Sequence, residues 1–172
     1  MHSMRRKASG KVGKMEQKEL KDEYGKLCKK YALPSFEQLD EEFEIRVIEI
    51  NKSGILIKAI LRWITNKLGF FMNYLEPVIS VPPQNIHALI EMRNISDSDR
   101  NEMFGFYKEI SVLLHENISV ELKSEKEIAQ QIKKIWKVWP DIKRREGILL
   151  DKITLAWQKK EEKPTEKTEY SG

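Results

Sequence analysis

The sequence predicts an all-α fold, an irregular bundle of five to six helices around a long apolar central helix. Residues 54–75, GILIKAILRWITNKLGFFMNYL, are apolar on every side of a helix except one narrow stripe of Lys58, Arg62, Asn66, Gly69 and Asn73. Most other segments repeat apolar residues every three or four positions. The only β-like run, residues 45–50 (IRVIEI), has no second run to pair with, so we interpret it as a buried connector.

Two helices are predicted before the central one. Between Met15 and Tyr31 a single apolar stripe recurs at helical spacing, formed by Leu20, Tyr24, Leu27 and Tyr31. This helix should end at Leu33-Pro34, because the residue before a proline avoids the helical region. Ser35 and Gln38 then form a capping box, which opens a short helix with Phe36, Leu39 and Phe43 on one face.

After the central helix, residues 80–83 (SVPP) predict a turn, and a short helical piece follows over 85–93. Ser96 should cap the next helix, with Asp97 and Asp99 at the positive end of its dipole. Its predicted buried stripe, with Phe106 and Leu113 beside it, is Met103, Tyr107, Ile110, Leu114 and Ile118.

The last part of the chain predicts two helices separated by a proline. Ser124 and Glu127 form a second capping box. The core face that follows is Ile128, Ile132, Ile135, Trp136 and Trp139. Pro140 should break or bend the chain, and the final helix carries Ile142, Leu149, Ile153, Ala156 and Trp157.

The charges of the segments alternate along the chain. Residues 37–49 are acidic, the central helix is basic, residues 97–121 are acidic and residues 123–146 are basic. This alternation predicts that these segments pack as neighbours with opposite charges at their rims. Exposed ion pairs are worth only about 0–1 kcal/mol each, so they favour a topology more than they add stability.

Residues 54–75 are long enough to span a bilayer, but their charges disfavour a span. Lys58 and Arg62 lie well inside the segment and Lys67 follows, and each buried cation costs about 2.5–3.5 kcal/mol on insertion scales. No signal-peptide core lies near the start, and the single cysteine, Cys28, suits a reducing compartment. We therefore expect a cytoplasmic protein.

The predicted domain organisation is one helical domain over residues 15–160, between a disordered basic arm, 1–14, and a disordered tail, 161–172. The arm carries no acid and five cations: Arg5, Arg6, Lys7, Lys11 and Lys14. The remaining residues hold 26 basic and 27 acidic side chains, so the net charge of +4 belongs to the arm. An alternative of equal weight is that Met15 is the initiator, which would remove the arm.

Catalytic chemistry is disfavoured by the absence of motifs. The eight glycines form no phosphate loop, and neither His87 nor His115 has a glutamate three residues before it or a second histidine four residues on. We predict no metal, no cofactor and no catalytic residue. If the protein were an enzyme, these two histidines would be the candidates for acid–base chemistry near neutral pH.

A basic run near the end of the chain is a candidate nucleic-acid surface. It comprises Lys133, Lys134, Lys137, Lys143, Arg144 and Arg145, with Trp136 and Trp139 between them. The two tryptophans share the predicted core face, so a solvated lysine face over a core is the favoured interpretation. Together with the arm, these residues are nevertheless the candidate phosphate-binding groups.

A pattern in the first half of the chain resembles small helical proteins of archaea. It is Tyr31-x-Leu33-Pro34-x-Phe36-x-x-Leu39-Asp40-x-x-Phe43-Glu44-Ile45, followed by the long helix and later by Trp139-Pro140. The similarity covers about Met15 to Lys160. It implies a cytoplasmic, single-domain helical protein and brings no activity, ligand or functional residue.

The sequence therefore favours a non-enzymatic interaction protein that binds a protein partner or self-associates. A small bundle with so apolar a central helix would leave an uncovered apolar strip, and such strips mark interfaces. The alternative is an RNA- or ribosome-associated factor that uses the basic arm and the Lys133–Arg145 face. A membrane partner is disfavoured.

Overall fold

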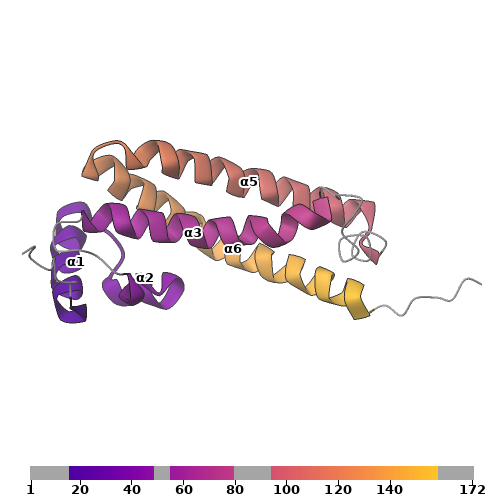
Figure 1. Cartoon of the computed structure of the whole chain (residues 1–172), viewed down its shortest axis with the longest axis horizontal. Coiled ribbons are helices and arrows are strands. Elements are labelled where there is room, and N and C mark those ends of the chain that lie inside the picture. The colour runs from indigo at the N-terminus through magenta and orange to yellow at the C-terminus, as the bar shows by residue number, and fades with distance from the viewer. Residues whose placement is uncertain (1–15, 49–54, 80–93, 159–172) are drawn as a thin grey trace, which may run out of the picture. The chain divides into compact units, whose positions relative to one another are not determined.

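The computed structural model describes residues 16–48, 55–79 and 94–158, and within them the protein is all-α, as predicted. The helices in Figure 1 are α1 (Gln17–Tyr31), α2 (Phe36–Phe43), α3 (Leu56–Ile79), α5 (Asp97–Glu121) and α6 (Glu125–Gln158), with a 3₁₀ turn, η1 (Ile45–Val47). The predicted arm 1–14, helical piece 85–93 and tail 161–172 lie outside the described residues.

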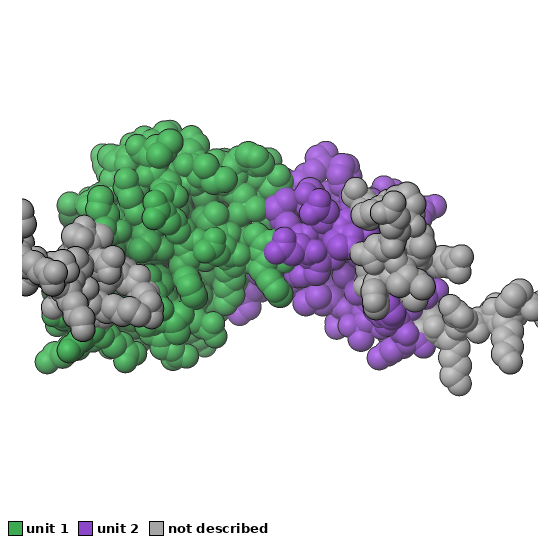
Figure 2. Space-filling model, in the orientation of Figure 1, with its two compact units in different colours: residues 1–70, 110–140 green, residues 71–109, 141–172 purple. Residues whose placement is uncertain are grey.

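The chain divides into two compact units, coloured in Figure 2. Unit 1 comprises residues 1–70 with 110–140, and unit 2 comprises residues 71–109 with 141–172. The division falls inside each of the three long helices, α3, α5 and α6. A single domain over residues 15–160 stays a prediction.

The helix ends of the first part of unit 1 follow local sequence signals. The α1 helix is capped by Ala32, whose left-handed backbone (φ 51°) directs the next N–H, that of Leu33, to the carbonyl oxygen of Cys28 at 3.3 Å. Ser35 accepts a hydrogen bond from the backbone of Gln38, whose side chain returns one to the Ser35 N–H, so the predicted capping box of α2 is confirmed. The β-like run begins as the turn η1, in which Ile45 is buried but Val47 is 51% exposed, so the predicted buried connector is only partly confirmed.

Helix α2 is held in unit 1 by two indoles. Trp63 of α3 donates to the Phe43 carbonyl oxygen at 2.5 Å, and Trp139 of α6 donates to the Glu42 carboxylate at 2.7 Å. The Phe43 ring lies 4.4 Å from that of Trp139, centroid to centroid. The predicted core position of Trp139 is confirmed, whereas Trp136 is only half-buried.

The α3 helix is amphipathic, which corrects the expected long apolar helix. Its buried face carries nine residues: Leu56, Ile57, Ile60, Leu61, Ile64, Leu68, Phe71, Leu75 and Val78. On the other side Arg62, Asn66 and Asn73 are exposed, and 64% of Phe70 is exposed. No helix among the described residues is long and apolar enough to cross a membrane.

The buried stripe of α5 also differs from the predicted one. Met103, Phe106, Ile110 and Asn117 are buried, whereas Ile118 is 60% exposed. The predicted stripe places Ile118 against the core, whereas the structure buries its neighbour Asn117. Since neighbouring helical residues point about 100° apart, burying Asn117 turns Ile118 outward.

Of the break or bend predicted at Pro140, the break is wrong, because helix α6 continues through this residue. Proline lacks the N–H that would bond the Trp136 carbonyl and usually kinks or breaks a helix. Pro140 is exposed, and the freed carbonyl of an exposed turn can bond to water instead. The predicted face of the second half is partly confirmed, because Ile142, Leu149 and Ala156 are buried but Trp157 is 42% exposed.

Candidate interaction surfaces

The predicted basic run is divided between the two units. Lys133, Lys134 and Lys137 belong to unit 1, and Lys143, Arg144 and Arg145 belong to unit 2. The five cations of the predicted arm, Arg5, Arg6, Lys7, Lys11 and Lys14, lie outside the described residues.

In unit 2 the arginines of the run are engaged by carboxylates. Arg145 forms ion pairs with Glu109 and Asp141, which raise the pKa of its guanidinium, and it lies 4.9 Å from the centre of the Phe106 ring. Arg144 pairs with Asp141 at 2.7 Å. These arginines therefore contribute little uncompensated positive charge.

In unit 1 two lysines of the run also have partners. Lys134 forms an ion pair of 2.6 Å with Glu116 of α5, which lowers the pKa of that carboxyl. Lys133 donates to the carbonyl oxygen of Tyr31 at 3.0 Å, at the C-terminal end of α1. Lys137 is exposed and forms no ion pair with any described residue.

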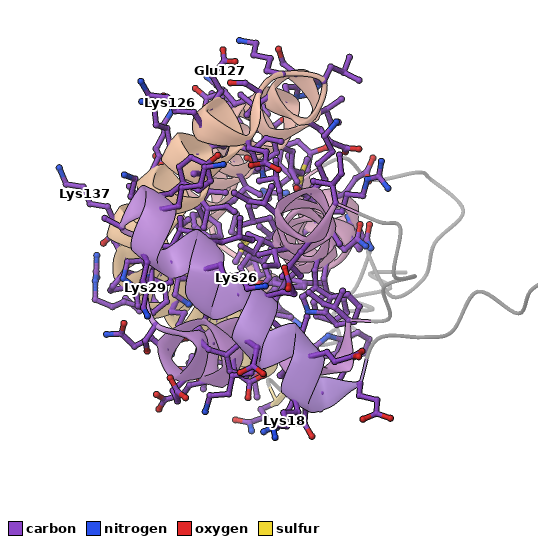
Figure 3. All side chains as sticks on the ribbon, turned by 90° about the vertical axis from the view of Figure 1, so that its left-hand side faces the viewer. Lys18, Lys26, Lys29, Lys126, Glu127 and Lys137 are labelled. Atoms are coloured by element: carbon purple, nitrogen blue, oxygen red, sulfur yellow. The ribbon has the colours of Figure 1, made fainter. Side chains whose placement is uncertain are left out.

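The structure adds exposed lysines that the sequence interpretation missed. Lys29 of α1 and Lys126 of α6 are exposed and form no ion pair within the described part of the chain. Figure 3 shows these two side chains and Lys137 directed away from the helices. We define the basic ridge as Lys126, Lys133 and Lys137 of α6 together with Lys29 of α1. The spacing of the α6 members is visible in the sequence, but only the fold places α1 against them.

A buried polar layer links α3, α5 and α6 in unit 1. Asn117 donates to the Thr65 hydroxyl at 3.0 Å and accepts from the Gln131 amide at 2.8 Å. Thr65 donates to the Leu61 carbonyl at 2.7 Å, and Gln131 also contacts Glu116 at 3.3 Å. Among the described residues every buried side-chain nitrogen and oxygen has a hydrogen-bond partner, so this layer is structurally satisfied.

Because Asn117 of this layer is turned inward, an apolar stripe lies on the solvent side of α5. Val112, Ile118 and Leu122 are 59%, 60% and 87% exposed, and exposed His115 lies between them. Steps of three and four residues place these four side chains on one side of the helix and its C-terminal end. We call this set the α5 outer face. The sequence interpretation missed it because it assigned Ile118 to the core.

Groups that could perform catalysis are dispersed in the described residues. His115 is exposed, with its Nδ1 2.7 Å from the Ser111 carbonyl oxygen, and His87 lies outside the described residues. The Cys28 thiol is half-buried and contacts the Leu33 carbonyl oxygen at 3.2 Å. The described residues contain no group of three or more side chains suited to hold a metal ion.

An open depression on unit 1 is shallow and carries charges of both signs. Lys21 pairs with Glu37 and Arg46 with Asp40 across it. Its lining is Lys21, Phe36, Glu37, Asp40, Glu41, Glu44 and Arg46. The depression is too open to enclose a small molecule, so the surfaces of the helices are the stronger candidates for function.

The fold and these surfaces define a small all-helical protein. Comparison with protein-family models, curated proteins and solved structures gives no significant match. The resemblance to small archaeal helical proteins therefore rests on the residues that suggested it.

Proposed function

We propose that this chain is a non-enzymatic interaction protein whose α5 outer face binds a protein partner or a second copy of itself. The observation that carries the proposal is that α5 is apolar on two sides. One side holds the buried Met103, Phe106 and Ile110, and the other holds the exposed Val112, Ile118 and Leu122. A helix that only covers a core needs one apolar side, and its other side is normally polar.

The α5 outer face fits a partner that presents an apolar helix. Its side chains are spaced along one side of a helix, the arrangement that packs against another helix or into an apolar groove. Burying one exposed aliphatic side chain of this size is worth about 1.5–3 kcal/mol. The carboxylates beside the face on α5, Glu116 and Glu121, are already paired with Lys134 and Arg62, so they would not oppose an apolar contact.

Two double variants test the proposal. Ile118→Ser with Leu122→Ser removes the most exposed part of the α5 outer face. Ile148→Ser with Leu155→Ser, at side chains 40% and 58% exposed on α6, is the matched control. We expect the first pair to weaken association at least tenfold, since tenfold corresponds to about 1.4 kcal/mol.

The readouts separate the two kinds of partner. Light scattering over a concentration series measures self-association, and quantitative affinity purification of the full chain measures a bound protein. Loss in the first variant with retention in the control, at unchanged far-ultraviolet circular dichroism, supports the proposal. A wild-type monomer with no stoichiometric partner, or equal behaviour of the two variants, contradicts it.

A further inference from the structure

We infer a second binding surface that is independent of the α5 outer face: the basic ridge is a site for the phosphate backbone of a nucleic-acid duplex. Its members, Lys29, Lys126, Lys133 and Lys137, all belong to unit 1 and are exposed. Three of them come from α6 and one from the last turn of α1.

The ridge is ordered by contacts between its two helices. Steps of seven and four residues place Lys126, Lys133 and Lys137 on one side of α6, about 10 Å and about 6 Å apart along the axis. Lys133 donates a hydrogen bond to the carbonyl oxygen of Tyr31, the last residue of α1. Glu125 accepts hydrogen bonds from the Tyr31 hydroxyl and from Lys30. These bonds bring the last turn of α1, and with it Lys29, against the first turns of α6.

The carboxylates near the ridge pair with lysines outside it, Glu125 with Lys30 and Glu127 with Lys123. The four lysines of the ridge form no ion pair with any described residue. The carboxylates of the two acids at the start of α6 are engaged elsewhere. Glu125 accepts from the Tyr31 hydroxyl and Lys30, and Glu127 accepts from the backbone N–H and the hydroxyl of Ser124. Both acids have lowered pKa values from these hydrogen bonds and stay ionised. In this respect the ridge differs from Lys134, Arg144 and Arg145, which are paired.

The surroundings of the ridge favour a duplex over a single strand or a membrane. Binding to single strands usually uses exposed aromatic rings as stacking surfaces, but Trp139 is buried and Trp136 is half-buried beside Phe43. Insertion into a membrane surface uses apolar side chains beside the lysines. Val138, the exposed apolar residue next in sequence, points about 100° away from Lys137 around the helix. The ridge therefore offers charge for phosphates without base recognition.

Two triple variants of the full chain test the inference. The ridge variant carries Lys29→Gln, Lys126→Gln and Lys137→Gln. It keeps Lys133, which donates a hydrogen bond to the C-terminal end of α1. The control variant carries Lys18→Gln, Lys58→Gln and Lys108→Gln, which remove the same amount of charge outside the ridge. Binding to a 20-base-pair RNA duplex of mixed sequence is measured by fluorescence anisotropy between 50 and 200 mM salt.

We expect the ridge variant to lose at least tenfold in affinity at 50 mM salt. The slope of log K against log salt should fall by about 2–3, or about one per phosphate contact removed. The control should lose less than threefold. Equal losses in the two variants, or no binding by the wild type, overturn the inference. So does a ridge-dependent affinity for phosphatidylserine vesicles that exceeds the affinity for the duplex.

Discussion

At the scale of single residues, Asn117 decides how α5 is turned in unit 1. It is 1% exposed and joins Thr65 and Gln131 in a satisfied network. A pattern of apolar residues does not reveal such a position, because a buried asparagine is stable only when partners from other helices satisfy it. The sequence could not show those partners, so Ile118 was placed in the core and the α5 outer face was missed.

The polar layer predicts a non-additive stability effect. Asn117→Ala should cost about 1–3 kcal/mol, since it leaves the Thr65 and Gln131 groups without their buried partner. Gln131→Ala should cost a similar amount, and the double variant should cost less than the sum. Urea unfolding measures all three, with Ser119→Ala on the exposed side of α5 as the control, expected to change stability by less than about 0.5 kcal/mol. Strict additivity would show that the layer does not act as a unit.

Tyr24 predicts a loss of stability at alkaline pH. Its hydroxyl donates to the Pro34 carbonyl at 2.7 Å, and burial raises its pKa above the ordinary value of about 10. The folded state favours the neutral phenol, so Tyr24 contributes to the free energy of unfolding. This contribution is fully present below about pH 10 and is lost as the pH rises toward the folded pKa.

The variant Tyr24→Phe separates this effect from the titration of lysines. It should be less stable than the wild type by about 1 kcal/mol at pH 7, because one hydrogen bond is lost. Between pH 9 and 11 its urea midpoint should fall less steeply than that of the wild type. If the urea midpoints of the two proteins fall in parallel over that pH range, Tyr24 is not the source of the alkaline loss of stability.

At the scale of helices, local signals in the sequence determined the ends well. The capping boxes at Ser35 and Ser124 and the cap at Ser96 have the predicted hydrogen bonds, because each involves residues three positions apart. The helix break predicted at Pro140 does not occur, for a physical reason. The helical propensity of one residue is outweighed when the residues on both sides of it are held by packing, as the buried Trp139 and Ile142 indicate.

Pro140 therefore predicts a site where stability can be gained. Pro140→Ala should stabilise the protein by about 1–3 kcal/mol, since alanine restores the missing N–H and the exposed proline ring loses no packing. Gly147→Ala in the same helix is the comparison, expected to add about 0.5–1 kcal/mol, because an added methyl group there meets no atom within 4 Å. Thermal unfolding measures both. A lower midpoint for Pro140→Ala would mean that the proline is required by the native backbone.

At the scale of the whole molecule, the sequence predicted the all-α class and the neighbours implied by charge alternation. In unit 1 acidic α5 pairs with both basic segments, through Glu121 with Arg62 of α3 and Glu116 with Lys134 of α6. It did not predict the division into two units or which lysines remain unpaired, because both depend on contacts between residues far apart in the chain. These contacts decide which side chains stay exposed and unpaired. The candidate surfaces therefore differ from the predicted ones.

The central claim is that the α5 outer face is the contact with another protein chain. The most direct measurement places a photo-crosslinking residue at position 118 in the full chain, and in a parallel sample at exposed Gln130 of α6. We predict a single adduct from position 118, to one partner or to a second copy, which mass spectrometry maps and which Leu122→Ser abolishes. No adduct from position 118 above the level seen at position 130 would contradict the claim.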